Sequence, residues 1–226
     1  MQNWIDQFFE AYLEAFPPRT VYTGEIPQEI ISSPVDNSGW FEWRLMKGTL
    51  PEDAYRKLED QFSVQFPQSF IAWHRSYFFL DGDCSLLRLP HSNPARPLEE
   101  METRLNWFIP EQLIPQQLYP FATEGNDAGM LVFDGREQKG DNEFPVRMYD
   151  YDYEGDIAGL REVIFSSFSK LIECMTHYCR ELKHRKGFEI IPDFFQIDQA
   201  GAGKSGRDYW MGWVDMMKAN FEEFGY

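Results

Sequence analysis

Three strand-like segments follow one another between residues 118 and 153, separated by links rich in Gly, Asn and Asp. The segments are LYPFAT, GMLVFD and FPVRMYDYDY. Apolar runs bounded by turn-forming residues are typical of strands. These strands are joined by hairpins more than by helical crossovers. The pattern therefore favours an α+β fold over a doubly wound α/β sheet.

Helical patterns bracket this strand-rich centre. Residues 4–16 and 167–183 each place aromatic and aliphatic side chains on one stripe, as amphipathic helices do. Ser166 or Ser167 is a candidate cap for the second of these helices. A further apolar stripe predicts a last helix near the C-terminus.

The remaining segments are shorter. WFEWRLM, residues 40–46, alternates and is typical of a strand. YFFL and SLLRL flank Asp81-Gly82, which predicts a hairpin. Residues 98–108 show helical spacing that ends with Phe108 turned inward, and FEIIPDFFQI, from residue 188 on, is strand-like.

We therefore expect one α+β domain over residues 1–226, with a central mixed, largely antiparallel sheet flanked by helices. Its core covers about residues 36–186. An N-terminal helix, 1–18, precedes the core, and a strand/helix extension, 187–226, follows it. The chain is 43% hydrophobic and 17% aromatic, which is enough for a sizeable core without disulfides.

The charge balance is strongly acidic, with 37 Asp and Glu against 21 Lys and Arg and a net charge of −16. Direct binding of nucleic acid is not expected, because phosphate contacts require a basic surface. A basic protein partner suits the charge, although many proteins are acidic for solubility alone. Three cysteines, no basic leader and no long apolar run predict a cytoplasmic protein that is not a membrane protein.

The stretch DQAGAGKSGRD, residues 198–208, resembles half of a phosphate-binding loop. Gly203, Lys204 and Ser205 fit the second half, but the first glycine is replaced by Asp198. Our interpretation is a flexible loop that enters a helix, with Ser205 as N-cap and Asp208 three residues on. Nucleotide binding by the 201–206 glycine loop is the remaining alternative.

Residues 150–156, DYDYEGD, follow the first half of a calcium loop, but the twelfth position is Arg161 in place of a bidentate Glu. A true helix–loop–helix site is not expected, while adventitious calcium binding stays open. Cys174, His177 and Cys179 do not share one helix face, which disfavours zinc. We predict no metal and no cofactor. The chain has no G-x-S-x-G elbow and no recognisable catalytic histidine, so we predict no catalytic residues and no enzymatic activity.

Acidic residues concentrate between residues 124 and 156, where Arg136, Lys139 and Arg147 are the basic residues. In an extended strand the acids at 150–156 would line one face, and Tyr149 with the tyrosines at 151 and 153 the other. Two interpretations stand: a docking face for a basic partner, or a solvated sheet edge. Aromatic side chains are frequent interface anchors. The candidate partner-binding residues are Asp127, Asp134, Asp150, Asp152, Glu154, Asp156, Tyr151, Tyr153, Trp40 and Trp43.

The order of these pieces resembles the SUKH superfamily, the Smi/Knr-type domains, over about residues 36–180. The matching positions keep the fold and are not a catalytic signature. They are Gly39, Trp40, the helix with Glu59, Phe66, Pro67, Phe121, Ala122, Gly129 to Asp134, Pro145, Val146, Ser167 and Phe168.

The resemblance implies a single α+β domain that acts by binding. Bacterial members are mostly associated with immunity to polymorphic toxins, many of them nucleases. We therefore expect a toxin-neutralising protein whose acidic face covers a basic toxin. The alternative is a regulatory scaffold of cell-wall glucan synthesis, as fungal members of the family are.

Overall fold

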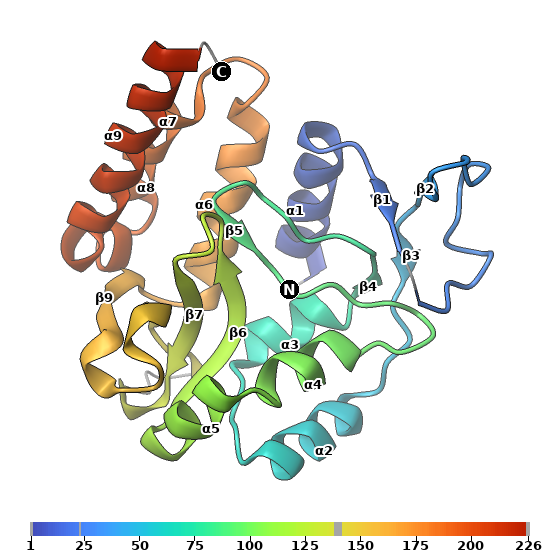
Figure 1. The fold of residues 1–226 in the computed structure, drawn as a ribbon, viewed down its shortest axis with the longest axis horizontal. Coiled ribbons are helices and arrows are strands. Elements are labelled where there is room, and N and C mark those ends of the chain that lie inside the picture. The colour runs from blue at the N-terminus through green and yellow to red at the C-terminus, as the bar shows by residue number, and fades with distance from the viewer. Residues whose placement is uncertain (1, 23, 138–141, 225–226) are drawn as a thin grey trace.

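A five-stranded sheet forms the centre of the computed structural model, which describes residues 2–22, 24–137 and 142–224 (Figure 1). The strands follow one another in sequence order and every pairing is antiparallel. They are β5 (Leu87–Arg88), β6 (Leu118–Glu124), β7 (Gly129–Asp134), β8 (Val146–Asp150) and β9 (Leu160–Phe165). The predicted α+β class is confirmed. The sheet of the described residues is an antiparallel meander and not the expected mixed sheet.

Two small antiparallel sheets precede it. β1 (Arg19–Val21) pairs with β2 (Trp40–Glu42), and β3 (Met46–Lys47) pairs with β4 (Tyr77–Phe78). The strand predicted over 40–46 is therefore two strands in different sheets. The hairpin predicted at Asp81-Gly82 is wrong as well, because its two arms pair elsewhere: β4 with β3, and β5 with β6.

Helices cover both faces of the central sheet. The helix with the clearest sequence pattern is α6 (Phe168–Glu181), and Ser167 caps it. The Ser167 hydroxyl oxygen accepts a hydrogen bond of 3.2 Å from the Lys170 N–H. The helices are α1 (Gln2–Ala15), α2 (Glu52–Phe62), α3 (Gln68–His74), α4 (Glu99–Leu105), α5 (Phe108–Leu113), α6 (Phe168–Glu181), α7 (Gly187–Ile190), α8 (Phe194–Ile197) and α9 (Arg207–Phe224).

Strand β7 shows how the two sides of the sheet are filled, because all six of its residues are buried. Leu131 and Phe133 join the main core with α3 and α6, where Phe133 stacks on Phe121 at 3.9 Å. Met130 and Val132 point to the other face and meet a smaller cluster under α5. The continuous apolar run GMLVFD follows from this burial on both faces.

The segment after residue 187 is helical, so the predicted strand there is wrong. FEIIPDFFQI forms α7, a 3₁₀ turn (Ile191–Asp193) and α8. Ile190 and Phe194 are fully buried in the same core as the sheet, and the Trp210 indole N–H donates a hydrogen bond of 3.0 Å to the Ile164 carbonyl. Residues 187–224 are thus packed into the main body, with α9 along one end of it (Figure 1).

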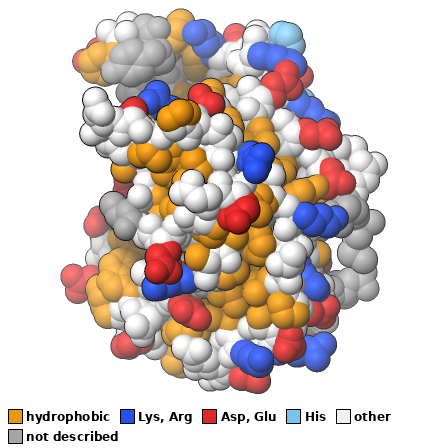
Figure 2. Space-filling model, turned by 90° about the vertical axis from the view of Figure 1, so that its right-hand side faces the viewer, with side chains coloured by type: hydrophobic (Ala, Val, Ile, Leu, Met, Phe, Trp, Pro, Cys, Tyr) orange, Lys and Arg blue, Asp and Glu red, His pale blue; other side chains and the backbone are white. Residues whose placement is uncertain are grey.

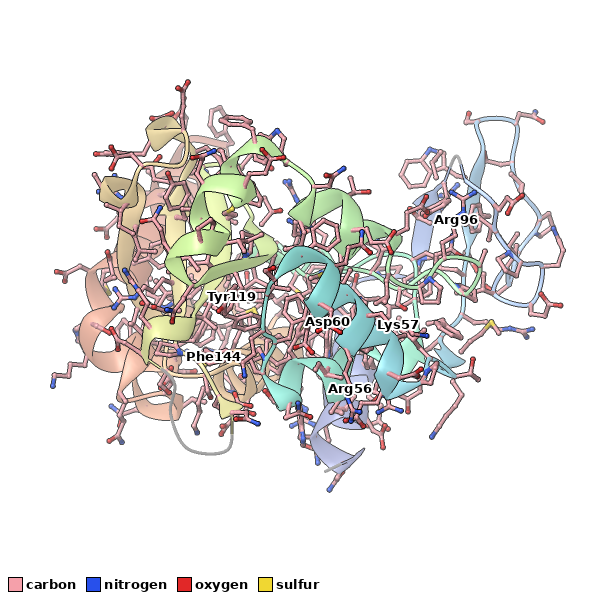
Figure 3. The ribbon with its side chains drawn as sticks, turned by 90° about the horizontal axis from the view of Figure 1, so that it is seen from below. Arg56, Lys57, Asp60, Arg96, Tyr119 and Phe144 are labelled. Carbon is pink, nitrogen blue, oxygen red and sulfur yellow. The ribbon has the colours of Figure 1, made fainter. Side chains whose placement is uncertain are left out.

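The outer surface of α2 is charged. Figure 3 shows the molecule from below, with Arg56, Lys57 and Asp60 on this helix and Tyr119 near Phe144 at the far end of the sheet. The rings of Tyr119 and Phe144 lie 6.2 Å apart. None of the helices within the described residues is long and apolar enough to cross a membrane.

Candidate functional site

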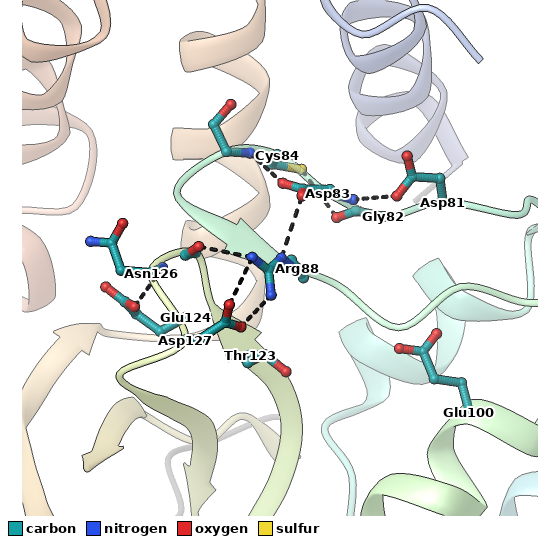
Figure 4. Close-up of polar contacts among 12 residues, drawn as sticks. Asp81, Gly82, Asp83, Cys84, Arg88, Glu100, Thr123, Glu124, Asn126 and Asp127 are labelled. Carbon is teal, nitrogen blue, oxygen red and sulfur yellow. Dashed lines mark hydrogen bonds and ion pairs between the residues drawn. The ribbon is translucent and has the colours of Figure 1, made fainter. Parts of the chain in front are cut away.

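One end of the sheet brings together most of the residues that the sequence singled out. The β6–β7 turn, the end of β8 and strand β5 meet there, and Arg88 connects β5 with the β6–β7 turn (Figure 4). The Arg88 guanidinium contacts Asp83 at 3.4 Å and the Gly125 carbonyl at 3.0 Å, and it forms an ion pair with Asp127. Asp127, with φ 60°, is therefore exposed but not unpaired.

The chain leaves β8 at Asp150 and forms two 3₁₀ turns, Tyr151–Tyr153 and Ile157–Gly159. The buried Tyr149 holds them, because its hydroxyl accepts from the Gly155 N–H at 2.7 Å and donates to the Asp156 carbonyl at 2.9 Å. Gly155 has φ 101°, and a Cβ there would lie 2.7 Å from Gln112 of α5. Only glycine fits this close approach.

These turns contradict the strand expected at 150–156. Successive side chains do not alternate between two faces there, because the extended backbone ends at Asp150. Tyr149 is buried, Tyr151 is half-buried and Tyr153 is exposed, so the three tyrosines do not form one buried row.

Three of the predicted docking acids, Asp127, Asp134 and Asp150, are held by arginines of their own chain. Asp134 is 0% exposed and accepts hydrogen bonds from Arg136 at 2.8 Å and Arg147 at 2.7 Å. Burial raises the pKa of Asp134, but the bonds and charges of these arginines outweigh it and lower that pKa below its usual value. We conclude that Asp134 stabilises the sheet and offers no surface to a partner.

Asp150 is half-buried and pairs with Arg161 at 2.7 Å, and the Arg161 hydrogen bond lowers the pKa of Asp150. Asp150 is therefore a poor contributor of free negative charge to an interface.

Two charged residues of the cluster between residues 124 and 156, Lys139 and Asp141, lie outside the described residues.

The other three acids, Asp152, Glu154 and Asp156, are exposed and take part in no ion pair within the described residues. Asp156 uses one carboxylate oxygen to accept from the Ala158 N–H at 2.8 Å, which fixes the second turn. These acids bring three negative charges together on five residues of chain. The structure thus divides the predicted acidic cluster into structural and exposed members.

Exposed aromatic side chains lie next to these acids. Trp107 is 43% and Phe108 48% exposed, with their rings 5.2 Å apart, and the Trp107 ring meets Tyr151 edge-on at 5.5 Å. We call Trp107, Phe108, Tyr151, Asp152, Tyr153, Glu154 and Asp156 the acid–aromatic surface. α5 holds the aromatic residues 107–108 beside the acidic turns at 151–156, because Gly155 of these turns packs against Gln112 of α5.

Sequence reasoning missed Trp107 and assigned Phe108 to the core. The predicted helix over 98–108 ends at Leu105, and α5 begins anew at Phe108, which rotates this ring out to solvent. The adjacent aromatic pair in NWFIP gave no signal by itself, because α1 buries the consecutive rings of Phe8 and Phe9.

A hollow of about 480 Å³ adjoins Trp107 and Tyr151, with Met130 at its side and Glu100 and Arg104 of α4 in its wall. Arg104 pairs with Glu100 at 2.8 Å, so the polar part of the wall carries no net charge. A neutral, aromatic-lined hollow of this kind suits an apolar side chain from a partner.

The two remaining candidates lie elsewhere. Trp43 is 1% exposed in the core and has no surface to offer a partner. Trp40 is exposed on β2, beneath the Arg19 guanidinium, and lies with exposed Val21 and Val35 on the side of the molecule opposite β9. That side shows hydrophobic side chains gathered among scattered charges (Figure 2).

The glycine segment is ordered by Asp198 and is not a flexible loop. Residues 201–205 form a π-helical turn, and the Asp198 carboxylate accepts from the Ser166 N–H at 2.7 Å and hydroxyl at 2.6 Å and from the Gly201 N–H at 3.1 Å. Ser205 does not cap α9, because its hydroxyl donates to the Val163 carbonyl at 2.8 Å. The backbone that would cradle a phosphate already holds a carboxylate.

Within the described residues, no three His, Cys, Asp or Glu side chains are placed to hold a metal ion. Cys174 and Cys179 are buried in the main body on α6. Compared with known proteins, the chain matches no family model, and no curated protein matches it. The case for a function therefore depends on the geometry described above.

Proposed function

We propose that this chain is a non-enzymatic binding protein of the SUKH type that neutralises a basic, nuclease-type bacterial toxin. The acid–aromatic surface is its docking face. Its acids attract the partner, and its aromatic side chains supply the apolar contact. Opposite charges steer association, whereas buried aromatic anchors supply most of the affinity in protein interfaces.

The observation that carries the proposal is the juxtaposition of Asp152, Glu154 and Asp156 with Trp107 and Phe108. An exposed apolar group rimmed by charged residues is typical of protein interaction sites. The partner is basic because these acids have no cation of their own among the described residues and the net charge is −16. A nuclease suits this chemistry, since its nucleic-acid site is itself basic.

Two features support the rest of the proposal. The α+β class agrees with the class that the SUKH resemblance implies, whereas the sheet is antiparallel and not the mixed sheet of the resemblance. Cys84, Cys174 and Cys179 are free and buried, which supports a reducing compartment, the cytoplasm.

The test is a pull-down with the purified chain from lysate at low salt, eluted with a salt step and assayed for nuclease activity. The triple variant D152N/E154Q/D156N removes the exposed acids. The matched control E10Q/E29Q/D60N removes three exposed acids elsewhere on the molecule. Trp107→Ala removes the largest ring of the acid–aromatic surface.

We expect a basic protein whose nuclease activity is inhibited in the complex and returns on elution. Affinity falls roughly tenfold or more for the triple variant and for Trp107→Ala, and stays unchanged for the control. Capture that is equally strong in all variants would refute this docking face.

A second candidate function, the scaffold of glucan synthesis, is favoured by the separate exposed apolar group of Val21, Val35 and Trp40. A scaffold needs more than one docking surface. Recovery of cell-wall synthesis proteins, lost on Trp40→Ala and retained on Trp107→Ala, would support it over immunity.

A further inference from the structure

A cavity of about 570 Å³ lies between α1, α6 and the end of α8, apart from the acid–aromatic surface. Trp4 and Gln7 of α1 form one wall and Ile197 another. Its volume is within the range of pockets that hold small organic ligands. No step of the proposed function uses it.

The floor is one stripe of α6. Ile172, Thr176, His177 and Arg180 follow the helical spacing that places side chains on a single face. Ile172 belongs to the core, whereas Arg180 is exposed at the rim. The floor therefore combines an apolar side chain with the Arg180 guanidinium, which forms the polar end of the cavity.

The polar end is cationic. Arg180 forms no ion pair within the described residues, whereas Glu173, the acid in the lining, is occupied by Lys170 at 2.6 Å. In a protein of net charge −16, an unpaired guanidinium at a cavity is the group that would retain an anion against the overall field.

His177 is held in place beside Arg180. Asp193 lies 2.8 Å from His177 Nε2 and also accepts from Arg185 at 2.5 Å. The Arg185 hydrogen bond, with that of His177, lowers the pKa of Asp193, so this carboxylate stays charged and fixes the ring. His177 Nδ1 has no hydrogen-bond partner among the described residues.

We propose that this cavity binds a small organic carboxylate with a flat apolar body. The Arg180 guanidinium takes the carboxylate, because its paired N–H groups match the two oxygens. The body packs against the Trp4 indole, Ile172 and Ile197, where a planar ring gains contact area.

The test is isothermal titration calorimetry with indole-3-acetate and its neutral isostere indole-3-acetamide, on the full chain. Arg180→Gln removes the guanidinium from the rim. Lys218→Gln on α9 is the matched control, since it removes one exposed positive charge outside the cavity. Circular dichroism and thermal unfolding check that each variant is folded.

We expect saturable binding of indole-3-acetate, about tenfold tighter than that of the amide, with Arg180→Gln weakening it about tenfold, or ~1.4 kcal/mol. Lys218→Gln leaves the affinity unchanged. The proposal is overturned by equal affinity for acid and amide, by an unchanged Arg180→Gln variant, or by the absence of saturable binding. None of these outcomes bears on the acid–aromatic surface, because a different face is tested.

Discussion

We expect acidification to destabilise this protein in part through one buried histidine, His74, at the end of α3. Its side chain is completely buried and stacks on Phe70 with ring centroids 5.6 Å apart. His74 Nε2 lies 3.2 Å from the His91 carbonyl, and Nδ1 lies 2.6 Å from the Tyr55 hydroxyl. A carbonyl only accepts, so Nε2 carries the proton and Nδ1 accepts from Tyr55.

Burial lowers the pKa of His74 from 6.5 to about 4, against the smaller opposing effects of the His91 carbonyl and the Glu100 charge. Above pH 6.5 the ring is neutral in both the folded and the unfolded chain. Between pH 6.5 and about 4 only the unfolded chain takes up the proton, so stability is lost as the pH falls through this window. One pKa unit corresponds to about 1.4 kcal/mol, so the loss is about 2 kcal/mol at pH ~5 and about 3 kcal/mol once both states are protonated.

The assay is urea unfolding of the parent chain and of His74→Asn at about pH 7.5 and about pH 5. Asparagine is a neutral amide that can still pair with Tyr55, and the titration of the acids is shared by both proteins. We expect the stability difference between them to shift by about 2 kcal/mol in favour of the variant on acidification. An equal difference at both pH values would refute the argument.

Three further predictions follow from the structure. Gly155→Ala places a side chain at φ 101° against Gln112, and should cost about 1–3 kcal/mol in urea unfolding; a loss under about 0.5 would contradict the tight packing. Asp198→Ala removes the acceptor for several N–H and O–H groups, and we expect a loss of about 3 kcal/mol by thermal or urea unfolding; a neutral effect would show that the π-helical turn does not need the carboxylate. Burial raises the pKa of the Cys174 thiol, and a hydrogen bond with Cys179 together with burial raises the pKa of the Cys84 thiol. A thiol reagent near neutral pH should therefore label these two thiols slowly in the native chain and fully in denaturant. Fast labelling of the native chain would contradict their burial.

The local sequence pattern was enough to predict those helices and strands that depend only on residues nearby in the sequence. The β7 run GMLVFD predicts a strand, and Ser166 or Ser167 predicts the start of α6, where the structure places the cap at Ser167, because a period or a cap depends only on nearby residues. The exposed acids at 152, 154 and 156 were also predictable, since charged side chains seldom become buried without a partner.

Other features depend on contacts between distant segments. FEIIPDFFQI has the composition of a strand, but packing of Ile190 and Phe194 against the sheet and α9 makes it helical. Asp134 is an acid like Asp152 in sequence, and Arg136 together with Arg147 on the neighbouring strand makes it structural.

The sequence by itself therefore determined the class of fold, the main helices, the three consecutive strands β6, β7 and β8 and the acidic character of the chain, but not strand β9. The tertiary structure alone decided which side chains face solvent: Trp43 is buried, whereas Trp107 and Phe108 are exposed beside the acids. The physical reason is that periodicity sets which residues share a face, but whether another element covers that face depends on how distant segments pack.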